Sequence, residues 1–258
     1  MKLSDYSKVQ SALQVLLILA AFAAVWQFSV TLFDVPEYLL PSVTDLIREF
    51  RSDWTFYLQN ALYTLETTAL AFVVASIIGV ALAIAVVSAK LVDNVIMTLL
   101  AAFHNVPKVA LAPLFVIWLG TGQLPKVAIG AMIAVFTIVV DTVVGLKSAD
   151  PEVINFARSK KAMPLTILTK VRLPGALPNL FGALKTATSF ALIGAVVGEF
   201  VGGEQGLGYI IMTAQGSFDT TRAFVAIVLL GLCGTALYYC VDFLEGIFLP
   251  WHVAHRKT

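Results

Sequence analysis

Six long apolar segments constrain the fold of this chain more than any other feature. A bilayer core needs about 20 apolar residues per helix, and a helix can cross it because its backbone groups bond to one another. Only 13% of the residues are charged, about half the share found in a typical soluble domain. The sequence therefore predicts an all-α polytopic membrane protein with about six transmembrane helices, in a single domain over residues 1–258. The segments run roughly over residues 10–33, 61–87, 95–119, 124–146, 180–200 and 223–248.

The first apolar segment has the features of a secretory signal peptide as an alternative. Lys2 and Lys8 precede it, and Ala21-Phe22-Ala23 has the small-residue pattern of a cleavage site. Its apolar run is longer than the 7–15 residues of a signal sequence, which favours an uncleaved membrane span.

The basic residues outside the spans predict the orientation, because cytoplasmic loops carry an excess of lysine and arginine. With the N-terminus inside, the inner segments hold most of these residues, including Lys90 and a basic cluster at 148–178. The outer segments then hold Arg48, Arg51, Lys126 and Arg222. We therefore expect both termini, including Arg256 and Lys257, and the 148–178 segment to be cytoplasmic.

The longest polar stretch between the spans runs from Ser148 to Pro178. Asp150-Pro151-Glu152 has the N-cap, first-turn proline and first-turn acid that start a helix. Met163-Pro164 starts a second short helix, which we expect Leu173-Pro174 to end. The result is a helix–turn–helix on the membrane surface, apolar on one side and basic on the other, with a shape suited to docking onto another protein. Six basic residues lie in or beside it: Lys147, Arg158, Lys160, Lys161, Lys170 and Arg172.

This stretch resembles the EAA loop of ABC-importer permeases, the membrane subunits of binding-protein-dependent uptake systems. The family pattern is E-A-A-x-x-x-G followed, after a spacer, by I/V-x-L-P. Asn155 stands at the Glu position, Phe156 and Ala157 at the two Ala positions, and Lys161 at the Gly position, where a Cβ disfavours a positive φ. The second half of the pattern is kept by Val171, Leu173, Pro174, Ala176, Leu177 and Pro178.

Two further segments resemble the nitrate/sulfonate/taurine/bicarbonate branch of this family. Residues 194–209 are similar to the segment after its fifth helix, and residues 35–42 to its first outer loop. The resemblance covers nearly the whole chain.

The resemblance implies a type I ABC-importer permease in the bacterial inner membrane. It implies a homodimer, two copies of a separate ATPase that binds the ATP, and an extracytoplasmic solute-binding protein. The solute would be an anion such as nitrate, sulfonate, taurine or bicarbonate, or alternatively an uncharged heterocycle such as a pyrimidine vitamin precursor. The residues expected to couple to the ATPase are Asn155, Phe156, Ala157, Arg158, Lys160, Lys161 and Ala162.

Polar residues within the spans are candidates for a translocation path, because they are costly in lipid unless they face protein or water. Pro107 and its polar neighbours interrupt the third span. Lys108 near the bilayer midplane would favour an anion, or else would pair with Asp141 or snorkel to an interface. Acids at helix ends also have a purely structural explanation. The candidate path residues are His104, Asn105, Lys108, Asp141 and Glu199.

The first outer loop contains an amphipathic helix. Ser42 and Asp45 begin it, and Val43, Leu46, Ile47 and Phe50 form its apolar stripe, with Glu49 among the polar residues facing away. The helix either touches an external binding protein or seals the outer rim of the bundle.

Enzyme chemistry finds little support in the sequence. His104, His252 and His255 are too scattered for a metal site, and no catalytic residue set is apparent. Glycine-rich residues 202–208 lack the G-K-[ST] of a phosphate loop. We expect no cofactor and no nucleic-acid partner, and reduced thiols at Cys233 and Cys240. A stand-alone channel or secondary transporter is the alternative from another class, and would predict inverted repeats.

Overall fold

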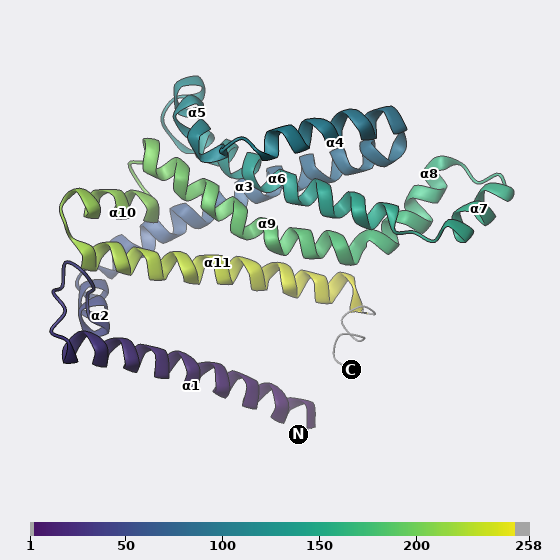
Figure 1. Cartoon of the computed structure of the whole chain (residues 1–258). Helices are drawn as coiled ribbons and strands as arrows, with labels where there is room; N and C mark the ends of the chain where they lie inside the picture. Colours follow the sequence, from purple (N-terminus) through teal and green to yellow (C-terminus); the bar gives the residue numbers. More distant parts are fainter. Residues whose placement is uncertain (1–2, 251–258) are drawn as a thin grey trace.

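The computed structural model describes residues 3–250, with the backbone alone for residues 3–12 and for His104. Within residues 3–250 every regular element is helical (Figure 1). Arg256 and Lys257, which we expect to be cytoplasmic, lie outside the described residues. The all-α prediction is confirmed for the described part of the chain.

Five helices are long and apolar enough to cross a membrane, and a bent pair would make a sixth. The long helices are α1 (Leu3–Leu32), α3 (Trp54–Ser88), α6 (Gln123–Lys147), α9 (Leu173–Gly202) and α11 (Thr220–Phe248). The shorter ones are α2 (Val43–Ser52), α4 (Lys90–His104), a 3-10 turn (Lys108–Leu111), α5 (Ala112–Leu119), α7 (Pro151–Ser159), α8 (Pro164–Ile167), a π turn (Leu168–Arg172) and α10 (Leu207–Gly216).

Small residues form the centre of the bundle, where α9 packs along α6 and α6 along α3. A Cβ built on Gly194 would overlap the Cα of Gly130 on α6, and one on Gly198 would lie 2.8 Å from the Cα of Lys126. Close approach of this kind is how membrane helices gain packing contacts. The alanines of these helices fill the same core: Ala71, Ala75, Ala131, Ala134, Ala187 and Ala191.

Helix α1 diverges from the other long helices towards its N-terminal end (Figure 1). Its C-terminal end is anchored through Trp26, whose indole N–H donates to the carbonyl of Pro41 at 3.1 Å. The Trp26 ring also meets the ring of Phe224 on α11, with centroids 5.9 Å apart. Over Leu13–Leu32, most of the remaining apolar surface of α1 is exposed in the single chain.

The predicted interruption of the third span is confirmed. Helix α4 ends at His104, and the axis turns by 85° between Lys90–Phe103 and Lys108–Leu119. Pro107 lies at the break with an extended backbone (φ −66°, ψ 93°). Proline disfavours the helical conformation in the residue before it, so the helix ends just upstream.

The prediction that Leu173-Pro174 ends the second short helix is wrong. The helical backbone continues from Pro164 to Gly202 through the π turn at Leu168–Arg172. Pro174 falls in the first turn of α9, directly after the π turn. Pro178 lies inside α9 and does not break it.

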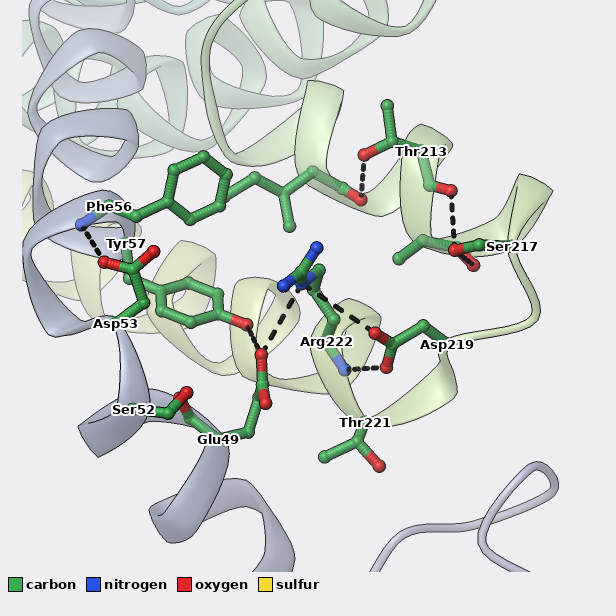
Figure 2. A network of polar contacts seen from close by, with 12 residues as sticks. Glu49, Ser52, Asp53, Phe56, Tyr57, Thr213, Ser217, Asp219, Thr221 and Arg222 are labelled. Atoms are coloured by element: carbon green, nitrogen blue, oxygen red, sulfur yellow. Dashed lines mark hydrogen bonds and ion pairs between the residues drawn. The ribbon is translucent and has the colours of Figure 1, made fainter.

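The end of the bundle at α2 is held by polar contacts between α2, α3 and α11 (Figure 2). Ser42 caps α2 as predicted, accepting from the Asp45 N–H at 3.2 Å. Glu49 does not face away as expected. Its carboxylate accepts from the Tyr57 hydroxyl at 2.9 Å and lies 3.5 Å from Nε of Arg222. The ring of Tyr57 is buried, and its hydroxyl lies between α2 and α11. The Glu49 carboxylate on α2 therefore points inward and accepts the hydrogen bond from this hydroxyl.

Candidate functional site

Helices α7 and α8 form an elbow that projects from one end of the bundle, opposite α5 and α10 (Figure 1). The predicted start of α7 is confirmed: the Asp150 carboxylate accepts from the Glu152 N–H at 2.8 Å, and Pro151 is the first helical residue. A carboxylate at this position also interacts favourably with the helix dipole.

Lys161 makes the turn of the elbow with φ +58°. The Ala162 N–H donates to the Ala157 carbonyl at 3.0 Å, and the Lys161 N–H to the Arg158 carbonyl at 2.8 Å. These two bonds form a Schellman C-cap, which usually has glycine at the left-handed position. The turn therefore forms without the glycine of the EAA pattern, at a cost of about 1 kcal/mol for the lysine.

The elbow presents exposed apolar side chains next to basic ones. The Phe156 side chain is 65% exposed, and Val153, Met163 and Leu165 are also exposed. The Lys160 ammonium lies 5.7 Å from the centroid of the Phe156 ring. An apolar centre with a charged rim is the anatomy of a protein docking surface. All seven predicted coupling residues lie in the second half of α7 or in the turn directly after it: Asn155, Phe156, Ala157, Arg158, Lys160, Lys161 and Ala162.

The candidate path residues are held by separate contacts. Asn105 is exposed and donates to the Ala101 carbonyl of its own helix at 3.2 Å. Lys108 is half-buried, with its ammonium 5.6 Å from the centroid of the Phe136 ring. No ion pair joins Lys108 to Asp141 in the described part of the chain. Asp141 is half-buried on α6, and the side chain of His104 lies outside what the structure describes.

Glu199 is the centre of a buried hydrogen-bond network near the C-terminal end of α9. Its side chain is 1% exposed and accepts from the Thr64 hydroxyl at 2.8 Å and from the Gly208 N–H at 2.7 Å. The Leu207 N–H donates to Thr64 in turn, at 2.8 Å. Gly206 turns here with φ +111°, and a Cβ on it would overlap the Glu199 carboxylate. Both Glu199 oxygens are thus occupied in fixing the start of α10 against α3.

Sequence reasoning missed two buried lysine sites. Lys185 on α9 donates to Asp242 and Glu245 on α11, and both Lys185 and Glu245 are buried. The sequence does show a lysine inside the fifth span and acids inside the sixth. That they pair depends on the packing of α9 against α11. Lys126 was expected in an outer segment and is 2% exposed. Its ammonium donates to the Tyr63 hydroxyl at 2.9 Å and lies 4.7 Å from the centroid of the Tyr63 ring.

Comparisons with known proteins agree on one family. The profile described as "Binding-protein-dependent transport system inner membrane component" matches residues 75–251. The chain is 36% identical over 231 residues to the riboflavin transport system permease protein RibX of Chloroflexus aurantiacus, covering 89% of this chain and 86% of that one. It is 28% identical over 246 residues to the putative aliphatic sulfonates transport permease protein SsuC of Bacillus subtilis, covering 93% and 88%.

A solved structure shares the fold. A chain of the inward-facing MetNI methionine ABC transporter superposes with a TM-score of 0.67 at 19% identity, covering 75% of this chain and 96% of that one. At this identity the likeness concerns the fold alone.

Proposed function

Since the chain belongs to the binding-protein-dependent transport system inner membrane component family, the permease components of ABC importers, we propose that it forms the translocation path for a small solute and that a separate ATPase drives it. ATP is then bound by the partner ATPase, and this chain needs no cofactor of its own.

The observation that carries the proposal is the projecting elbow. Phe156 and Ala157 provide an apolar contact, and Arg158, Lys160 and Lys161 provide the charges around it. Such a surface suits a groove with an apolar floor and acidic edges in the ATPase. The positive-inside pattern of the sequence supports a cytoplasmic elbow and cytoplasmic termini.

The proposed assembly has two copies of this chain, two ATPase subunits on the cytoplasmic side and a solute-binding protein on the outer side. Closure of the ATPases on ATP would move the two elbows. Because the helical backbone runs from Pro164 to Gly202 without a break, a movement of the elbow is passed along α9 to its outer end. The bundles then open outward to the loaded binding protein, and hydrolysis restores the inward-facing state.

The solute is proposed to be a small anion such as nitrate, sulfonate, taurine or bicarbonate. The sulfonate relative supports this choice, as does a half-buried cation at the break of the third span, Lys108. The riboflavin relative supports an uncharged heterocycle as the second candidate. A thermal-shift screen of the accompanying binding protein against both classes separates them.

The substitution Ala157→Asp tests the coupling role. An acid in the apolar centre of the elbow would have to be desolvated on docking, so we expect the stimulation of ATPase turnover by loaded binding protein to fall at least about tenfold. The measurement is ATPase activity and solute uptake of the reconstituted complex. Thr169→Asp, which adds the same charge at an exposed site on the π turn, should behave as wild type.

Normal stimulated turnover in a folded Ala157→Asp complex would refute the assignment of the elbow. An unchanged melting temperature and elution volume of the isolated subunit would show that the bundle is intact.

A further inference from the structure

A cavity of about 400 Å³ lies between the elbow and the inner end of α3. Its walls come from α3, α7, α8 and the π turn, and include Val87, Ser88, Arg158, Leu165, Leu168 and Arg172. Two of the lining residues are arginines and none is acidic. The cavity is therefore strongly cationic, and it is large enough for a phosphate group with a short substituent.

The Arg172 guanidinium is incompletely bonded. Its Nη1 donates to the Val87 carbonyl at 3.3 Å, which caps the C-terminal end of α3. Its Nε is buried and has no hydrogen-bond partner among the described residues. A buried donor left unbonded is destabilising, and a guanidinium has five donor hydrogens in all. Capping alone thus leaves most of the hydrogen-bonding capacity of Arg172 unused.

Arg158 brings a second guanidinium to the same cavity from the last turn of α7. Its side chain is exposed. Two acids on this side of the bundle already have partners: Asp93 pairs with Lys147 at 2.6 Å, and Asp150 caps α7. Neither arginine forms an ion pair in the described part of the chain.

We propose that this cavity binds a phosphate-bearing anion between Arg158 and Arg172. Planar guanidinium groups bind phosphate oxygens in pairs, which makes arginine the residue of choice for such a ligand. A small turn of the Arg172 side chain towards the cavity gives its Nε an oxygen acceptor. The ligand joins α7 to the π turn and the end of α3, and so fixes the angle of the elbow. The site goes beyond the permease function, because it can be occupied without any ATPase or solute.

The phosphate group can come from two sources: the headgroup of an anionic phospholipid in the inner leaflet, or a free phosphate in the cytoplasm. The full-length chain, purified in detergent, is titrated with inorganic phosphate by calorimetry. In a second arm, native mass spectrometry counts bound phosphatidylglycerol against phosphatidylcholine. We expect saturable binding of one ligand per chain in at least one arm. Phosphate binding identifies the free anion, and selective phosphatidylglycerol binding without it identifies the lipid.

Three variants assign the binding to the cavity. Arg158→Gln and Arg172→Gln should each weaken binding about tenfold, the loss expected for one charge-assisted hydrogen bond. Lys170→Gln removes an exposed charge from the same π turn without touching the cavity, and should bind as wild type.

Absence of binding in both arms overturns the proposal. So does equal binding by wild type, Arg158→Gln and Arg172→Gln. If Arg172→Gln unfolds because the α3 cap is lost, the exposed Arg158 variant alone decides. Because the readout is binding to the isolated chain, failure here is distinct from failure of the coupling role tested with Ala157→Asp.

Discussion

At the level of single residues, Glu199 is a membrane acid whose carboxylate fixes the start of α10 against α3. The sequence marks it as a carboxylate at the end of a span, which fits either a structural role or a transport role. The structure surrounds it with Thr64, Gly206 and Gly208. Its partner Thr64 lies 135 residues away in the sequence, so no local pattern could reveal the network.

Replacing Glu199 with alanine should destabilise the outer end of the bundle. The Thr64 hydroxyl and the Gly208 N–H would lose their buried acceptor, at a total cost of about 2–4 kcal/mol. The melting temperature of the purified chain should fall by roughly 5–10 °C. Glu204→Ala, which removes an exposed acid from the loop between α9 and α10, should leave it nearly unchanged. Unaltered melting with abolished transport in Glu199→Ala would instead place this residue on the path.

The contacts of the charged residues inside the spans were only partly predictable, because their partners lie on helices far away in the sequence. Lys108 could be recognised as unusual from its position alone, and Lys185 likewise. Which acid each one meets is decided by helix packing: Lys185 reaches Asp242 and Glu245 on α11, whereas Lys108 lies against an aromatic ring.

At the level of helices, the sequence predicted starts and breaks better than continuations. Asp150-Pro151 and Pro107 act on their immediate neighbours, so their effects could be read locally. Pro174 looked equally decisive, but a π turn precedes it and the helix continues. The polar face of α2 was misjudged at Glu49, because a partner on α11, Arg222, lies far away in the chain.

The contact between α6 and α9 gives a sharp test of helix packing. Gly194→Ala should lower stability by about 1–3 kcal/mol, because its methyl group would overlap Gly130 and force the helices apart. Gly182→Ala on the same helix has open space around it, and should be neutral or stabilising by up to about 1 kcal/mol. Thermal unfolding of both variants in one detergent measures the difference. Equal effects at the two positions would contradict this packing.

At the level of the whole molecule, the start of α1, the end of α11 and the elbow all point to the same end of the bundle (Figure 1). The sequence predicts this arrangement from the distribution of lysine and arginine. What it could not predict is that the outer end is held by specific polar contacts, such as that of Glu49 with Tyr57 (Figure 2).

Cysteine labelling tests which end is cytoplasmic. In a background with Cys233→Ser and Cys240→Ser, the Ser52→Cys variant should react with a membrane-impermeant maleimide in intact cells. The Ser159→Cys variant should react only after the cells are opened. Both serines are exposed in the structure, so access to reagent is not limited by packing. Labelling of the Ser159→Cys variant in intact cells would invert the orientation and remove the elbow from any cytoplasmic partner.

The anchorage of α1 at its outer end has a consequence for how the protein is made. Trp26 leaves the ribosome before its aromatic partner Phe224, which emerges nearly 200 residues later. Domains generally fold in the order of their synthesis. Helix α1 therefore lies in lipid without this contact to α11 until Phe224 has been synthesised.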